Sequence, residues 1–147
     1  MAMLTSTIVL YMHSGRGGYE TTLEAGRGLS LFLKSIAQKG LQSGVLQTLN
    51  IDCEKNSLAV EPSDGRLSQW KCPKDIRMVS VTGIEGFSLD AGTDFIEIPP
   101  EGLEQSLQFV LVGVDLKEVI VTWKLGGLLC DIDNNSLEQW SFGVERF

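Results

Sequence analysis

Hydrophobic and polar positions along the chain repeat with two different periods, and the change falls near Gly44. From Glu20 to Lys39, apolar residues recur every three or four positions, which places them on one face of a helix. This apolar stripe consists of Ala25, Leu29, Phe32, Leu33, Ile36 and Ala37. Acidic residues lie early in the segment and lysines late, as the helix dipole favours. We therefore predict an amphipathic helix over residues 20–39, with Gly40 as its C-terminal stop.

Two glycines, Gly26 and Gly28, lie inside the predicted helix. Each lowers helix stability by up to about 1 kcal/mol relative to alanine. We interpret them as positions where another backbone approaches the helix closely.

After Gly44 the apolar residues alternate with polar ones in short runs, which is typical of β-strands. We predict roughly eight or nine strands, mostly joined as hairpins. The runs are 45–51, 57–61, 66–70, 76–81, 86–89, 94–98, 106–114, 118–123 and 128–132. The most apolar pair, 106–114 and 118–123, is expected to form a central hairpin that turns at 115–117. The predicted fold class is α+β, with the N-terminal helix packed on an antiparallel, two-part sheet.

Length and composition indicate a single globular domain over residues 1–147, because 43% of the residues are apolar and 21% are charged. The net charge is −7 and the basic residues are scattered. Nucleic-acid binding needs a concentrated basic surface, so we exclude it. The apolar run 4–12 is interrupted by three hydroxyl residues and is shorter than the ~20 residues that cross a bilayer.

The cysteines Cys53, Cys72 and Cys130 contain no C-x-x-C pair, and His13 is the one histidine. No zinc site of the usual ligand spacing can be assembled from this set, and we expect no metal. Three buried or half-buried thiols are favoured over the alternative, a Cys53–Cys72 disulfide with one free thiol.

The segment "IVLYMHSGRGGYE" at 8–20 has the strand, glycine loop and helix order of a phosphate-binding or oxyanion loop. It lacks the lysine of a P-loop, and Glu20 occupies the third glycine position of a dinucleotide fingerprint. An esterase would need a G-x-S-x-G motif and a second histidine, and both are missing. A cysteine nucleophile with His13 as its base stays open, but an exposed His13 without catalytic function is favoured. We predict no catalytic residue and no cofactor.

One oxygen-rich cluster occurs in "CDIDNNSLE", where Asp131, Asp133 and Asn135 fit the first ligand positions of a calcium loop. Ser136 replaces the required glycine and Phe142 replaces the bidentate glutamate, which excludes an EF-hand. We favour a polar turn between two strands over a looser surface calcium site.

Several segments occur in an order that is known from one family. They are a helix ending "LFLKSIAQKG", a strand from Val45, the turn "DGRLSQW", the strand "CPKDIRMVSV" after a proline, "DFIEIPPEG", and an apolar hairpin with Gly126 and Gly127 near its end. From about Ser14 to Asp131 the chain resembles the minor pseudopilins of type II secretion, specifically the H-type, and the related type IV pilin-like assembly proteins.

This resemblance implies a pilin-like fold and a non-catalytic subunit of a secretion or pilus-like filament. Its partners would be other pseudopilin subunits and secreted cargo, on the periplasmic side of the bacterial inner membrane. The family's N-terminal signature and full membrane helix are absent. We therefore expect residues 1–19 to be a truncated membrane-helix stub or linker, with the native full-length form anchored through the missing helix. On this interpretation Ile8, Leu10 and Tyr11 belong to the assembly interface.

The alternative is a compact β-rich binding or adaptor module of unknown partner. Two observations would distinguish it from a pseudopilin. One is whether a membrane helix is encoded upstream, and the other is whether residues 8–12 continue the helix or pair in the sheet.

Overall fold

The computed structural model describes residues 18–62, 65–114 and 117–135. In these ranges one α-helix precedes nine strands. The elements are α2 (Gly18–Ser43), β1 (Gln47–Asp52), β2 (Ser57–Glu61), the 3₁₀ helix η1 (Gly65–Ser68), β3 (Gln69–Lys71), β4 (Arg77–Gly83), β5 (Ser88–Leu89), β6 (Thr93–Ile98), β7 (Leu107–Val112), β8 (Glu118–Trp123) and β9 (Cys130–Asn135). The predicted α+β class is confirmed.

The strands form two antiparallel sheets, which confirms the two-part arrangement. Sheet A has the order β3-β2-β1-β6 and sheet B has the order β5-β4-β7-β8-β9. The predicted central hairpin is confirmed as well, since β7 pairs with β8 from Leu107↔Trp123 to Val112↔Glu118. The chain crosses from sheet A to sheet B between β3 and β4, returns for β6, and crosses again before β7.

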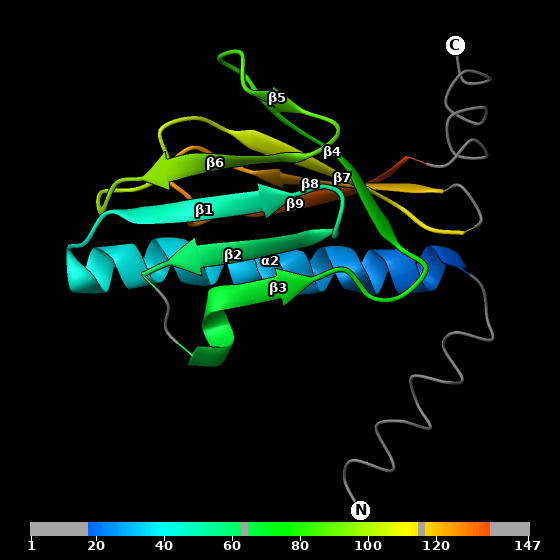
Figure 1. Cartoon of the computed structure of the whole chain (residues 1–147), viewed down its shortest axis with the longest axis horizontal. Coiled ribbons are helices and arrows are strands. Elements are labelled where there is room, and N and C mark those ends of the chain that lie inside the picture. The colour runs from blue at the N-terminus through cyan, green and yellow to red at the C-terminus, as the bar shows by residue number, and fades with distance from the viewer. Residues whose placement is uncertain (1–17, 63–64, 115–116, 136–147) are drawn as a thin grey trace, which may run out of the picture.

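Helix α2 runs alongside both sheets, with its axis close to the direction of β1 and β2 (Figure 1). All six residues of the predicted apolar stripe are buried, with at most 8% of any of them exposed. The alternate residues of the strands complete one shared core. They include Leu49, Ile51, Leu58, Val60, Leu107, Phe109, Leu111, Val119, Val121 and Trp123. The helix is thus held on the sheets by burial of its apolar face.

The helix extends beyond the predicted end. It continues to Ser43, and the left-handed residue that stops it is Gly44, with φ 69°. The N–H of Gly44 donates to the carbonyl of Gly40 at 2.9 Å, as in an αL cap. Gly40 is needed for a different reason: a Cβ atom there would lie 3.0 Å from Nε2 of Gln47 and 3.7 Å from the backbone of Pro100.

The interpretation of the two helix glycines is correct about close approach at Gly26 alone, where a side chain and not a backbone approaches, and it is wrong at Gly28. At Gly26, an added Cβ would lie 2.9 Å from Cγ1 of Val119, in sheet B. At Gly28, it would lie 3.6 Å from Nε1 of Trp70, in sheet A. Side chains of the two sheets, and not another backbone, approach the helix at these positions.

The predicted strand at 66–70 is mostly wrong. Residues 65–68 form the 3₁₀ helix η1, and the strand itself is the short β3. Gly65 has φ 66°, and the hydroxyl of Ser68 donates to its carbonyl at 2.7 Å. This local hydrogen bond competes with the sheet ladder.

Candidate interaction site

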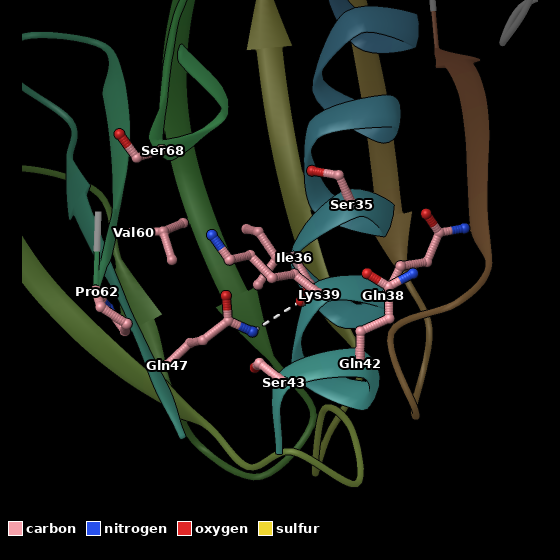
Figure 2. A pocket seen from close by; sticks show the side chains of 10 residues that line it. All are labelled: Ser35, Ile36, Gln38, Lys39, Gln42, Ser43, Gln47, Val60, Pro62 and Ser68. Carbon is pink, nitrogen blue, oxygen red and sulfur yellow. Dashed lines mark hydrogen bonds between the residues drawn. The ribbon is translucent and has the colours of Figure 1, made fainter. Parts of the chain in front are cut away.

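A groove lies between the last turns of α2 and sheet A (Figure 2). Its volume is about 430 Å³. The helix contributes one wall, and β2 with the segment after it contributes the other. The lining residues are Ser35, Ile36, Gln38, Lys39, Gln42, Ser43, Gln47, Val60, Pro62 and Ser68.

A buried side-chain hydrogen bond fixes the relation of the two walls. Gln47 begins β1 with its side chain on the inner face, only 2% exposed. Its Nε2 donates to the backbone carbonyl of Ile36 at 2.8 Å (Figure 2). Gly40 leaves room for this amide, so the strand and the helix stay in close contact. Buried polar groups are stable in a core when they are paired in this way.

The chemistry of the groove is that of amides and hydroxyls over a small apolar surface. Ile36, Val60 and Pro62 supply the apolar part, and Lys39 supplies one cation. No carboxylate, cysteine or histidine is among the lining residues. Such a surface can form hydrogen bonds with polypeptide amides, but its side chains form no acid–base pair of the kind that hydrolytic chemistry needs.

Exposed aliphatic side chains gather at the same end of the molecule, where α2 ends and β1 begins. We call this set the leucine end: Leu41, Val45, Leu46, Leu125, Leu128 and Leu129, which are between 45% and 67% exposed. The first three lie around the α2–β1 connection and the other three in the β8–β9 connection.

Tight glycine packing places the β8–β9 connection against the last turns of α2. A Cβ atom at Gly127 would lie 2.8 Å from Cβ of Ala37, so the β8–β9 connection lies against the last turns of α2. The N–H of Gly126 donates to the carbonyl of Leu103 at 2.8 Å, and Trp123 Nε1 donates to the carbonyl of Gly127 at 2.7 Å. A group of exposed apolar side chains is a typical protein-interaction surface.

The three cysteines are free thiols, one buried and two half-buried, as the sequence predicts. Burial, and then the neighbouring Cys53, raises the pKa of the Cys72 thiol to about 12. Burial also raises the pKa of Cys53, with Asp52 and Asp90 adding to the effect. The pKa of Cys130 is raised by burial, against the opposing effects of Ser30 and Lys34. All three thiols are therefore protonated near pH 7 and are poor nucleophiles.

The oxygen-rich cluster lies on strand β9, so the predicted polar turn is wrong for Asp133 and Asn135, while Asp131 belongs to the strand predicted at 128–132. Asp131 and Asp133 lie on β9, an edge strand that pairs with β8 over its whole length. The ladder hydrogen bonds to β8 hold these residues extended instead of letting them turn. Asp131 forms an exposed ion pair with Lys124, with Oδ2 and Nζ 2.8 Å apart. In the part of the chain that the structure describes, no group of three or more histidine, cysteine or acidic side chains is placed to hold a metal ion.

The predicted assembly residues Ile8, Leu10 and Tyr11 lie outside the described residues, as does His13. The expected contact of these residues with other subunits stays a prediction. Sequence reasoning missed both the groove and the leucine end. The runs "GLQSGVL" and "LGGLL" carried a signal for the leucine end. Leucines beside turn glycines lie in connections, outside the helix and strand faces that pack in the core.

No protein-family model, curated protein or solved structure matches the chain. Among the described residues, no helix combines the length and the apolar character that crossing a membrane requires.

Proposed function

We propose that the chain is the globular part of a non-catalytic, pilin-like subunit: a minor pseudopilin of type II secretion or of a type IV pilus-like filament. The observation that carries this proposal is the order and packing of the elements. One long helix comes first, and two antiparallel sheets fold on its apolar face. In such a subunit the helix is the structural axis and the sheets carry the surfaces for partners.

In this proposal, the direction of α2 indicates how the subunit would be anchored in the inner membrane. Its apolar stripe is buried from Ala25 to Ala37, so the C-terminal part of the helix is fixed in the body. A further apolar helix that continued N-terminally from α2 would leave the body and enter the inner membrane. In this proposal Ile8, Leu10 and Tyr11 form contacts between neighbouring helices, and the globular part lies in the periplasm.

Partner contact is assigned to the leucine end and the groove beside it. Six exposed aliphatic side chains supply apolar area, and the groove supplies amide and hydroxyl groups that suit a polypeptide. The partners would be other pseudopilin subunits and secreted cargo. The raised pKa values of the thiols also support a non-catalytic function, because they remove the most reactive nucleophiles from the described part of the chain.

A second candidate is a compact β-rich adaptor module without a membrane anchor. The same groove and leucine end favour it, since both would bind a partner without any filament. The two candidates differ in what lies N-terminal to α2, and in whether the partner is another subunit of similar fold.

Site-specific photo-crosslinking in the source cell tests the assembly proposal. A photoreactive amino acid replaces Leu129, which is 67% exposed at the leucine end. The matched control replaces Lys74, an exposed residue in the β3–β4 connection. We expect Leu129 to crosslink to pseudopilin subunits or secreted cargo, and Lys74 to give no such product. Equal crosslinking from both positions, or crosslinking from Leu129 to unrelated soluble proteins, would contradict the proposal.

A further inference from the structure

Sheet A ends at β6, which pairs with β1 on one side and with no strand of the described part of the chain on the other (Figure 1). The edge strands β3 and β5 span only three and two residues, and such short edges resist further pairing. Strand β6 spans six residues and pairs with β1 over its whole length. It therefore offers a ladder that is long enough for one more strand.

The hydrogen bonds between β1 and β6 show which backbone groups point away from β1. The N–H of Cys53 donates to the carbonyl of Gly92 at 2.9 Å, and these two residues directly continue the β1–β6 register. Along an antiparallel pair, residues alternate between facing the partner strand and facing away from it. The backbone groups of Thr93, Phe95 and Glu97 therefore point away from β1. We call these groups the free edge of β6.

The side chains along β6 are accessible as well. Phe95 lies opposite Asn50 on the outer face of sheet A and is 57% exposed. Thr93, Asp94 and Glu97 are also exposed. The N–H of Phe95 donates to Oδ1 of Asp94 at 2.8 Å. An incoming strand would need this N–H, so pairing requires the Asp94 carboxylate to move away from it.

We propose that a second copy of the chain pairs with β6, antiparallel and across a two-fold axis, so that two copies of sheet A join into one continuous sheet. Ladder hydrogen bonds form only between residues of the two free edges. In the register centred on Phe95, that residue lies opposite its own copy, and Thr93 lies opposite Glu97 of the second copy. Every backbone group of the free edge then has a partner. The two exposed phenylalanine rings cover each other, which is a favourable cross-strand pair.

The neighbouring symmetric registers are less favourable. A shift in one direction places Asp94 opposite Asp94 of the second copy, and like charges directly opposite each other are destabilising. A shift in the other direction places Thr93 opposite Pro99 of the second copy, which has no N–H to donate. The register centred on Phe95 avoids both costs and sets no like charges directly opposite each other. This self-complementarity favours a second copy of the chain as the occupant of the edge.

We expect a weak dimer, because one strand with its flanking side chains forms a contact at the small end of specific interfaces. Each copy carries a net charge of −7, so repulsion opposes the pairing and added salt should strengthen it. A basic peptide on the same edge would show the opposite salt dependence. The inference goes beyond the proposed function and does not depend on it.

Sedimentation velocity combined with amide hydrogen exchange tests the pairing on the purified full chain. Samples span about 10 to 500 µM protein at about 0.15 and 0.5 M salt. We expect a monomer–dimer equilibrium that shifts toward the dimer at the higher salt. In exchange measured by nuclear magnetic resonance, the N–H groups of Thr93, Phe95 and Glu97 should become protected as the protein concentration rises. The N–H groups of Asp94 and Ile96 face β1 and should be protected at every concentration.

Three outcomes overturn the proposal. In the first, the chain stays monomeric over the whole concentration range. In the second, a dimer forms but the three free-edge N–H groups exchange as fast as in the monomer, which would place the contact elsewhere, for example at the leucine end. In the third, the chain stays monomeric and an added peptide of alternating lysine and valine protects the same three groups, which would assign the edge to a basic partner.

Variants of β6 locate the contact. Glu97→Pro removes an N–H that does not pair with β1, and we expect it to weaken the dimer at least tenfold. Its matched control, Glu97→Thr, keeps this N–H and should pair at least as well as the wild type.

Asp94→Ala frees the N–H of Phe95 and should strengthen the dimer roughly tenfold. The control Asp133→Ala removes an exposed carboxylate from β9, the edge strand of the other sheet, and should change the dissociation constant less than twofold. Equal strengthening by Asp94→Ala and Asp133→Ala would overturn the proposal, because a general loss of charge would then explain both. The wild-type exchange measurement needs no variant, so it decides the question even if a variant folds poorly.

Discussion

Gly26 and Gly28 lie on the same helix and approach different sheets. Substituting alanine at each position therefore separates the effect of side-chain packing on stability from the effect of helix propensity. In the interior of a helix, alanine is more favourable than glycine by about 0.8–1.0 kcal/mol. At Gly28 the new Cβ would lie 3.6 Å from Nε1 of Trp70, an ordinary van der Waals distance. Gly28→Ala should therefore stabilise the protein by about 1 kcal/mol.

At Gly26 the same helix gain meets a steric cost. The new Cβ would lie 2.9 Å from Cγ1 of Val119, 3.4 Å from Cγ2 of Val121 and 3.7 Å from Cγ2 of Ile132. Val119 is fully buried in β8, and its branched side chain has few alternative rotamers. Overpacking of this kind costs about 1–3 kcal/mol. We expect Gly26→Ala to have a net effect between neutral and about 2 kcal/mol destabilising.

Urea unfolding followed by far-ultraviolet circular dichroism measures both variants on one scale. The free energy of unfolding should be lower for Gly26→Ala than for Gly28→Ala by about 1–3 kcal/mol. In thermal unfolding this corresponds to roughly 3–10 °C. If Gly26→Ala is as stable as Gly28→Ala, the close contact between α2 and β8 is refuted.

Three further predictions concern single side chains. Gln47→Met removes the hydrogen bond to the Ile36 carbonyl and should destabilise the protein by about 0.5–1.5 kcal/mol in urea unfolding. At low pH, Gln47→Glu should lose only part of this stability, because its protonated carboxyl group can donate to the same carbonyl. Since the folded pKa of Cys72 is raised from 9.0 to about 12, its contribution to stability is complete below pH 9 and is lost as the pH rises from 9 to 12. Unfolding measured across this range should show a falling stability, and Cys72→Ala should flatten the slope. Lys124→Ala breaks only the exposed pair with Asp131, so its urea midpoint should equal that of the wild type within error.

Much of the fold follows from periodicity. The stripe from Ala25 to Ala37 predicts both the helix and its buried face, because an apolar repeat of about 3.6 residues matches the α-helix and not the β-strand. In β8, Val119, Val121 and Trp123 are buried and their neighbours are less so, although the sequence at 119–121 is a continuous apolar run. The pairing of β7 with β8 follows from the short connection between two apolar runs.

The boundaries depend on interactions that the sequence does not display. The sequence predicts Gly40 as the helix stop, and only the backbone conformation assigns that function to Gly44. The 3₁₀ helix before β3 contains a hydrogen bond from the hydroxyl of Ser68 to the carbonyl of Gly65, which periodicity does not indicate. At Asp133 and Asn135, ladder pairing with β8 outweighs the turn preference of aspartate and asparagine.

The candidate site could not be predicted, because it is assembled from distant segments. The groove joins residues of α2 to Val60, Pro62 and Ser68, which are far along the chain. At the leucine end, the close approach of Gly127 to Ala37 places the β8–β9 connection against the last turns of α2, a segment far away in the sequence. The assembly residues predicted from the sequence lie outside the described ranges and stay a prediction.

The membrane association of the natural gene product tests the proposed pilin-like function most directly. Cells of the source organism are fractionated, the membranes are washed with high salt, and the mature N-terminus is identified by mass spectrometry. A pilin-like subunit should stay in the inner-membrane fraction until detergent is added, and should carry an apolar helix of ~20 residues upstream of α2. A product that begins at Met1 or Met3 and is recovered in the soluble fraction would contradict the proposed function and favour the adaptor module.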